Sequence, residues 1–344
     1  MANERTDAVA ELSFSTDDLA RMRFCVSPMW QVGTSFRLLR SDVADPLHRR
    51  WLDQVRPRVT AAGLDRGWLS GLIPAAAGYV PDFLNPTPPG PAPTLAEELA
   101  AVAATTPERV RRDLDHLRRH EGGLTDRLRM LHADPRRGLE GLVEEIEAYW
   151  ELALAPYWSR VRALLDADVR HRARQAAEYG TGHLFNDLHP LASWHDNALR
   201  LVHRRPRTFT RTAAGGGLLL VPCAFKGPGL STRVTPSEPP QLAYRARGTG
   251  TLWESRPATG TTALAAVLGR TRTLLLAELD APATTTELAA RIGSSMAGVS
   301  QNLTALRDAG LVTAHRTGRT VLYARTETAE ALVAPPDPPP ETRP

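Results

Sequence analysis

Lysine is almost missing from this sequence. Lys226 is the only lysine among 42 basic residues, so arginine supplies nearly all of the positive charge. A formal net charge of +4 permits binding to nucleic acid without requiring it. A preference for arginine over lysine is also what a GC-rich genome produces, and we favour this interpretation over a functional one.

Cysteine is scarce as well. Two cysteines, Cys25 and Cys223, are too few for a disulfide framework or a cysteine-based zinc site, which favours a reducing compartment. We interpret both as small buried hydrophobic residues, because a redox switch needs an exposed thiol of low pKa.

Long apolar runs are absent too. Stretches such as GGGLLLVPCAF are much shorter than the ~20 residues of a membrane span. The N-terminal stretch MANERTDAVAELSFS lacks the apolar segment of a secretory signal. We therefore expect a cytoplasmic protein with no membrane partner.

Tryptophan is missing from the C-terminal part. All seven tryptophans lie at or before Trp253, and the chain beyond is rich in Ala, Thr, Leu and Arg. This change in composition predicts an N-terminal domain over 1–255 and a second domain over 262–333. The proline-rich tail 334–344 is expected to be disordered.

Helical spacing of apolar residues dominates the first half of the chain. It predicts helices over 27–41 and 45–57, and a long helical segment over 138–180 that Pro156 divides in two. Later, short runs separated by Gly and Pro predict the strands of a small antiparallel sheet. These runs are ALRLV, RTFTRT, GLLLVPCAF and PQLAYRA.

The second domain begins with a predicted amphipathic helix over 262–279. Its apolar residues repeat at helical intervals, at Leu264, Val267, Leu268, Leu275 and Leu279. The run Leu274 to Leu276 cannot face a single core. Part of it must contact either a second copy of the chain or the N-terminal domain, and the sequence does not decide between these.

A helix-turn-helix and a hairpin follow. Thr284 and Glu287 form a capping box for one helix, and Gly293 ends it. Another helix is predicted over about 295–309, and residues 311–325 alternate like a strand pair. The layout is that of a winged helix-turn-helix. The expected fold class is therefore α+β, with a mainly helical N-terminal domain, a small antiparallel sheet and a C-terminal winged helix-turn-helix.

The segment TTTELAARIGSSMAGVSQNLTALRDAGLVTAHRTGRTVLYAR resembles the ArsR-type winged helix-turn-helix domain of bacterial transcription regulators. The resemblance covers about 262–330, under a quarter of the chain. The longer N-terminal part resembles the sensor-like domain that precedes such a module in some actinobacterial regulators. The residues that match the ArsR pattern are Glu287, Leu288, Ala289, Gly293, Ser295, Val299, Ser300, Leu303, Leu306, Arg307, Ala309, Gly310, Leu311, Val312, Arg316, Gly318, Arg319 and Tyr323.

This resemblance implies a homodimer that binds double-stranded DNA at a near-palindromic operator. Its first helix and the final helix TETAEALVA would form the dimer surface. Two departures matter. Asn302 stands where the family usually has His, which bears on base preference. No cysteine follows Cys223, so a thiolate metal site of the family's metal sensors is excluded.

DNA contacts are expected from the helix over about 295–309 and from the wing over about 313–325. Gln and Asn can bond adenine bidentately, Ser and Thr can reach bases or phosphates, and arginines bind phosphates. Arg325 fits a DNA contact and a structural role equally well. The predicted DNA-binding residues are Ser295, Ala297, Gly298, Ser300, Gln301, Asn302, Thr304, Arg307, Arg316 and Arg319.

The remaining clusters indicate no chemistry of their own. His183, His189 and His195 are spaced by six residues, which fits no compact helical ligand pair, so we expect capping and surface roles. We expect no metal, cofactor or catalytic residue. The tryptophan-rich N-terminal domain is a reasonable place for a small apolar ligand.

The sequence therefore predicts a one-component, sequence-specific transcription regulator and not an enzyme. A repressor is expected, and the sequence does not distinguish repression from activation. Two alternatives stay open. One is an enzyme or ligand-binding protein whose winged helix is an interaction or dimerisation module. The other is a constitutive DNA-binding protein whose first domain is purely structural.

Overall fold

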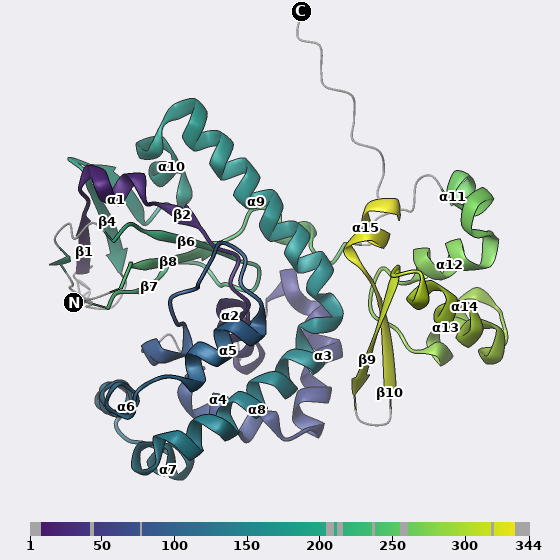
Figure 1. Cartoon of the computed structure of the whole chain (residues 1–344), viewed down its shortest axis with the longest axis horizontal. Helices are drawn as coiled ribbons and strands as arrows, with labels where there is room; N and C mark the ends of the chain where they lie inside the picture. The colour runs from purple at the N-terminus through teal and green to yellow at the C-terminus, as the bar shows by residue number, and fades with distance from the viewer. Residues whose placement is uncertain are drawn as a thin grey trace, which may run out of the picture.

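The computed structural model describes residues 8–41, 45–75, 78–203, 210–211, 216–235, 238–254, 261–317 and 320–333. Helices dominate this part of the chain and the strands form small sheets, so the expected α+β class is confirmed. Two sheets lie at the N-terminal side, and the last helices lie with a hairpin at the opposite side (Figure 1). No described helix is both long and apolar enough to cross a membrane.

The ends of the N-terminal helices follow local sequence signals. Ser27 caps α2, Thr94 caps α5, and Pro107 opens α6. Pro156 lies in the turn η4 (Ala155–Tyr157) between α8 and α9, as the sequence predicts. The helices are α1 (Thr16–Ala20), α2 (Pro28–Arg40), α3 (Arg49–Ala61), α4 (Trp68–Leu72), α5 (Leu95–Ala103), α6 (Pro107–Glu121), α7 (Asp126–Ala133), α8 (Pro135–Ala153), α9 (Trp158–Tyr179) and α10 (Thr181–Leu188), with further short turns η1 (Pro46–His48), η2 (Leu64–Arg66), η3 (Asp82–Leu84) and η5 (Thr249–Thr251).

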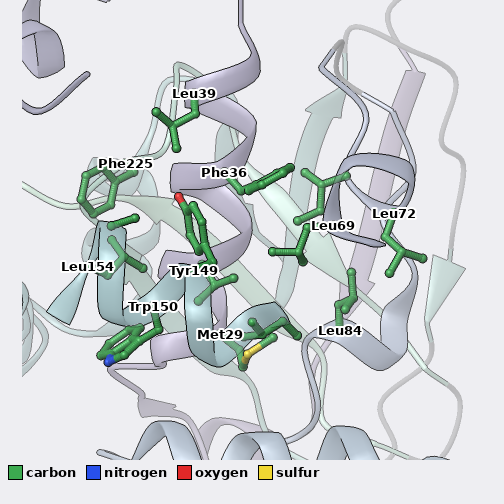
Figure 2. Packing of buried hydrophobic residues seen from close by; sticks show 14 of the residues in the cluster. Met29, Phe36, Leu39, Leu69, Leu72, Leu84, Tyr149, Trp150, Leu154 and Phe225 are labelled. Carbon is green, nitrogen blue, oxygen red and sulfur yellow. The ribbon is translucent and has the colours of Figure 1, made fainter. Parts of the chain in front are cut away.

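An apolar core fills the helical part (Figure 2). Phe36 of α2, Leu69 of α4 and Tyr149 of α8 are almost completely buried in it. The hydroxyl groups of Ser35 and Tyr149 lie 2.8 Å apart, so the buried phenol has a hydrogen-bond partner. Apolar packing and this hydrogen bond together fix α8 against α2.

The predicted strands form two sheets, not one antiparallel sheet. Their orders are β3-β4-β1-β5 and β2-β6-β8-β7. In the second sheet β6 pairs in parallel with both β2 and β8, and all five of its residues are buried. Burial on both faces explains the continuous apolar run of this strand. The strands are β1 (Ala8–Ser13), β2 (Arg23–Phe24), β3 (Ala192–His195), β4 (Ala198–His203), β5 (Thr210–Arg211), β6 (Leu219–Cys223), β7 (Ser231–Arg233) and β8 (Gln241–Arg245).

The sequence does not predict the placement of two further segments. Helix α10 lies between α9 and β3, and its Leu184, Phe185 and Leu188 are buried with residues of the first sheet. Trp253, which lies in a segment rich in Gly and Thr, is only 8% exposed and belongs to the helical core. The strand expected at RTFTRT lies outside the described residues apart from β5.

The single helix expected over 262–279 is wrong. Gly269 has φ +85°, in the left-handed region, and separates two helices there. Val267, expected to face inward, is 81% exposed, whereas Leu275 and Leu279 are buried. The C-terminal elements are α11 (Thr261–Leu268), α12 (Arg270–Glu278), α13 (Thr285–Ile292), α14 (Met296–Asp308), β9 (Val312–Thr317), β10 (Thr320–Arg325) and α15 (Glu327–Val333).

A separate apolar cluster holds these C-terminal elements together, and all its members lie within 264–333. The C-terminal elements also contact the chain where α8 is followed by α9. Ser159 Oγ donates to the carbonyl of Arg325 at 2.8 Å, and Arg160 Nη1 donates to the carbonyl of Asp280 at 2.6 Å. The domain limits stay predictions, since 255–260 and 334–344 lie outside the described residues.

Candidate nucleic-acid interface

Local signals build the turn between α13 and α14. Thr284 Oγ1 accepts the N–H of Glu287 at 3.2 Å, and the Glu287 carboxylate accepts the N–H of Thr284 at 2.7 Å, which confirms the predicted capping box. Gly293 ends α13 with φ +65°. Ser295 then caps α14 by accepting the N–H of Gly298 at 3.1 Å. The helix-turn-helix expected from these residues is present.

The apolar stripe of α14 determines which face is open to solvent. It is formed by three residues that are at most 2% exposed, Val299, Leu303 and Leu306. They share a core with Leu288 of α13 and Leu276 of α12. Because an α-helix has 3.6 residues per turn, the polar residues that alternate with this apolar stripe along α14 lie on the opposite face of the helix.

That open face offers small, uncharged polar groups. Ser300, Gln301 and Thr304 are all exposed. Thr304 Oγ1 donates to the carbonyl of Ser300 at 3.0 Å, and the Gln301 amide offers both a donor and an acceptor. Ala297 is exposed and Gly298 is half-buried at the N-terminal end of α14, where small side chains allow a close approach.

Two predicted DNA contacts already have partners within the module. Asn302 is half-buried, and its Nδ2 donates to the carbonyl of Gly298 at 2.8 Å, one helical turn back. Arg307 lies 3.7 Å from Asp308 in an exposed ion pair, which contributes little to stability. Met296, which we did not predict, is 57% exposed at the start of α14. Methionine is usually a core residue, so the pattern contains no signal for it.

The hairpin separates its arginines into two environments. Arg316 is exposed near the end of β9, and Arg319 lies outside the described residues. Arg325, at the other end of the hairpin, is 4% exposed. Its Nε lies 3.1 Å from Glu330 Oε1, and its Nη1 donates to the carbonyl of Leu276 at 3.3 Å. Arg325 therefore has a structural role.

One side of the hairpin faces the N-terminal part. The ring of His315 in β9 is 15% exposed, and its Nδ1 lies 3.6 Å from the Glu151 carboxylate of α8. Burial lowers the pKa of His315, and Glu151 partly opposes that shift. The sequence does not predict this contact, because it joins residues that are far apart along the chain.

Apolar side chains remain exposed on α11, α12 and α15. Val267, Leu274 and Leu332 are 81%, 41% and 46% exposed. Leu275 and Leu276 are fully buried in the core of the C-terminal module, so only Leu274 of the triple run needs another partner. The first and last helices of this module are where we expect the dimer surface, and dimerisation stays a prediction.

The histidines and cysteines noted in the sequence do not converge. The ring of His183 lies tilted against that of Tyr179, and His195 lies 3.2 Å from Asp196. Within the described ranges no group of three or more His, Cys, Asp or Glu side chains could hold a metal ion. Both cysteines are buried, as expected, and burial raises the pKa of the Cys25 and Cys223 thiols to about 12.

Comparison with known families gives two matches. Residues 104–250 match a family of unknown function, DUF5937, and residues 262–315 match a family described as helix-turn-helix domain. No curated protein and no solved structure matches the chain. The helix-turn-helix match covers α11 to α14 and part of β9, the segment that resembles ArsR-type modules. This C-terminal match supports a DNA-binding regulator.

Proposed function

We propose that the chain is a one-component transcription regulator, without catalytic activity, that binds operator DNA through its C-terminal module. In this proposal α14 enters the major groove and the hairpin contacts the flanking backbone. The observation that supports it most is the orientation of α14. Its apolar stripe is buried, and Ser300, Gln301 and Thr304 face solvent together.

The contacts would divide by chemistry. Ser300, Gln301 and Thr304 would meet base edges, and the small residues Ala297 and Gly298 would let the helix approach closely. Ser295, Arg307, Arg316 and Arg319 would bind phosphates, which fix position without reading sequence. Asn302 would contribute less, because its amide nitrogen already has a partner in its own helix.

A near-palindromic operator would be bound by a homodimer. Val267, Leu274 and Leu332 offer apolar surface to a second copy. The N-terminal domain would sense a signal or set the dimer geometry. Because it touches β9 through Glu151 and His315, a ligand with different affinities for two arrangements could change DNA binding.

The test is binding of the full chain to DNA upstream of its own gene over a salt series. We expect a specific complex whose affinity falls as salt rises. Arg316→Ala should weaken binding to all sequences and reduce the salt slope by about one. Arg136→Ala, which removes an exposed arginine at the start of α8, should change neither. Equal affinity for unrelated DNA at moderate salt would refute the proposal.

A further inference from the structure

A cavity of about 340 Å³ lies in the N-terminal part, between α2 and the segment that joins β6 to β7. The rings of Trp30 and Phe225 and the side chain of Leu38 provide apolar walls. Arg37 and Lys226 also line it. The volume is typical of a small-molecule site, and the lining combines these apolar walls with polar and charged side chains, among them Asp82, Ser231 and Arg233.

Lys226, the only lysine of the chain, is 8% exposed in this cavity. Its Nζ donates to Ser231 Oγ at 2.9 Å. The ammonium group forms no ion pair with a carboxylate of the described residues, including Asp82, the acidic residue of the lining.

The charged groups around Lys226 do not balance the positive charge of its ammonium group. Burial is the largest effect on the pKa of Lys226 and lowers it to about 8; Cys223 opposes this shift, whereas the nearby Arg37 and Arg245 add to it. Arg233, which also lines the cavity, forms an ion pair with Glu238, a carboxylate that Arg109 shares. A buried cation without a counter-charge is costly, so the site favours an anion.

We propose that this cavity binds a small organic carboxylate whose anionic group pairs with the Lys226 ammonium. Its apolar body would pack against Trp30, Leu38 and Phe225. The expected ligand is thus amphipathic, and not simply apolar as the tryptophan content suggests. The inference does not depend on DNA binding, and a failed operator assay would leave it intact.

A single lysine makes the test direct. Biosynthetic labelling with [13Cε]lysine gives one side-chain NMR signal, which belongs to Lys226 without further assignment. We expect 3-phenylpropionate to shift this signal saturably in the full chain. The neutral 3-phenylpropanamide and acetate, which lacks an apolar body, should shift it only at concentrations at least tenfold higher. An equal effect of the amide, or no saturable shift with 3-phenylpropionate, would overturn the proposal.

Glycine at position 33 allows a steric test that leaves Lys226 unchanged. Gly33 lines the cavity, and an added Cβ would meet no atom within 4 Å. Gly33→Leu should fill the space and weaken 3-phenylpropionate binding at least tenfold by calorimetry, while Gly33→Ala should stay within threefold. Lys226→Met should also lose at least tenfold, with circular dichroism verifying the fold. Unchanged affinity in folded Gly33→Leu would place the ligand elsewhere and contradict the proposal.

Discussion

At the scale of single residues, two arginines of one hairpin differ in their environment. Arg316 is exposed, whereas Arg325 is buried and bonded to α15 and α12. Sequence spacing alone does not decide whether Arg325 contacts DNA or has a structural role. Its partners, Glu330 and the carbonyl of Leu276, come from outside the hairpin, and strand alternation says nothing about them.

Removal of the Arg325 charge should therefore destabilise the C-terminal module. Arg325→Met leaves Glu330 without its partner, and we expect a loss of roughly 3 kcal/mol in the free energy of unfolding. Arg316→Met, the matched exposed variant, should stay within about 0.5 kcal/mol of the parent. Urea unfolding followed by circular dichroism measures both. Equal effects of the two variants would show that Arg325 has no structural role.

At the scale of elements, features set by neighbouring residues were predictable and others were not. The Thr284 capping box, the end of α13 at Gly293 and the hairpin of β9 and β10 all appear where the sequence places them. Helical periodicity failed at Gly269, because apolar spacing continues through a glycine whose positive φ ends the helix. Sheet pairing was also missed, since the apolar run of β6 does not specify parallel partners.

Any side chain at position 269 should lower the stability of the folded chain. Gly269→Ala forces a Cβ into a left-handed conformation, and we expect a loss of about 1–2 kcal/mol of stability. Gly33→Ala, within α2 and at an ordinary helical φ, should instead stabilise by up to about 1 kcal/mol. Thermal unfolding of both variants gives the comparison. Stabilisation by Gly269→Ala would mean that α11 and α12 form one continuous helix.

At the scale of the whole molecule, the features that the sequence did not predict are contacts between residues far apart along the chain. The hairpin contacts the α8–α9 corner, and Lys226 lines a cavity formed with α2. Lys226 was visible as the only lysine, but composition gave it no location. The helix-turn-helix module, whose predicted DNA-binding residues lie within one short segment, was the part most accessible to prediction.

Buried titratable groups should also make stability depend on pH. Trp253 Nε1 donates to His48 Nδ1 at 2.9 Å, and burial lowers the pKa of His48 to about 4. His48 thus stays neutral in the folded chain, and its contribution is lost as pH falls from about 6.5 toward 4. Burial raises the pKa of Glu98 to about 7, so its effect is opposite, with stability lost as pH rises from about 4.5 to 7.

His48→Gln separates these two effects. The glutamine keeps an acceptor for Trp253 but cannot titrate. The free energy of unfolding of the variant should therefore rise relative to that of the parent, by up to roughly 3 kcal/mol, as pH falls from 6.5 to 4. Denaturant unfolding at several pH values measures this difference. A difference that does not change with pH would mean that His48 titrates normally in the folded chain.

The central claim is that the open face of α14 reads DNA sequence. Its most direct test is operator preference, the ratio of specific to unrelated DNA affinity at fixed salt, for Gln301→Ala beside Asn302→Ala. Gln301→Ala should cost about 1–3 kcal/mol of that preference. Asn302→Ala should cost less, since Nδ2 of Asn302 is bonded to Gly298. Unchanged preference in Gln301→Ala, or a larger loss in Asn302→Ala, would contradict this assignment of the reading face.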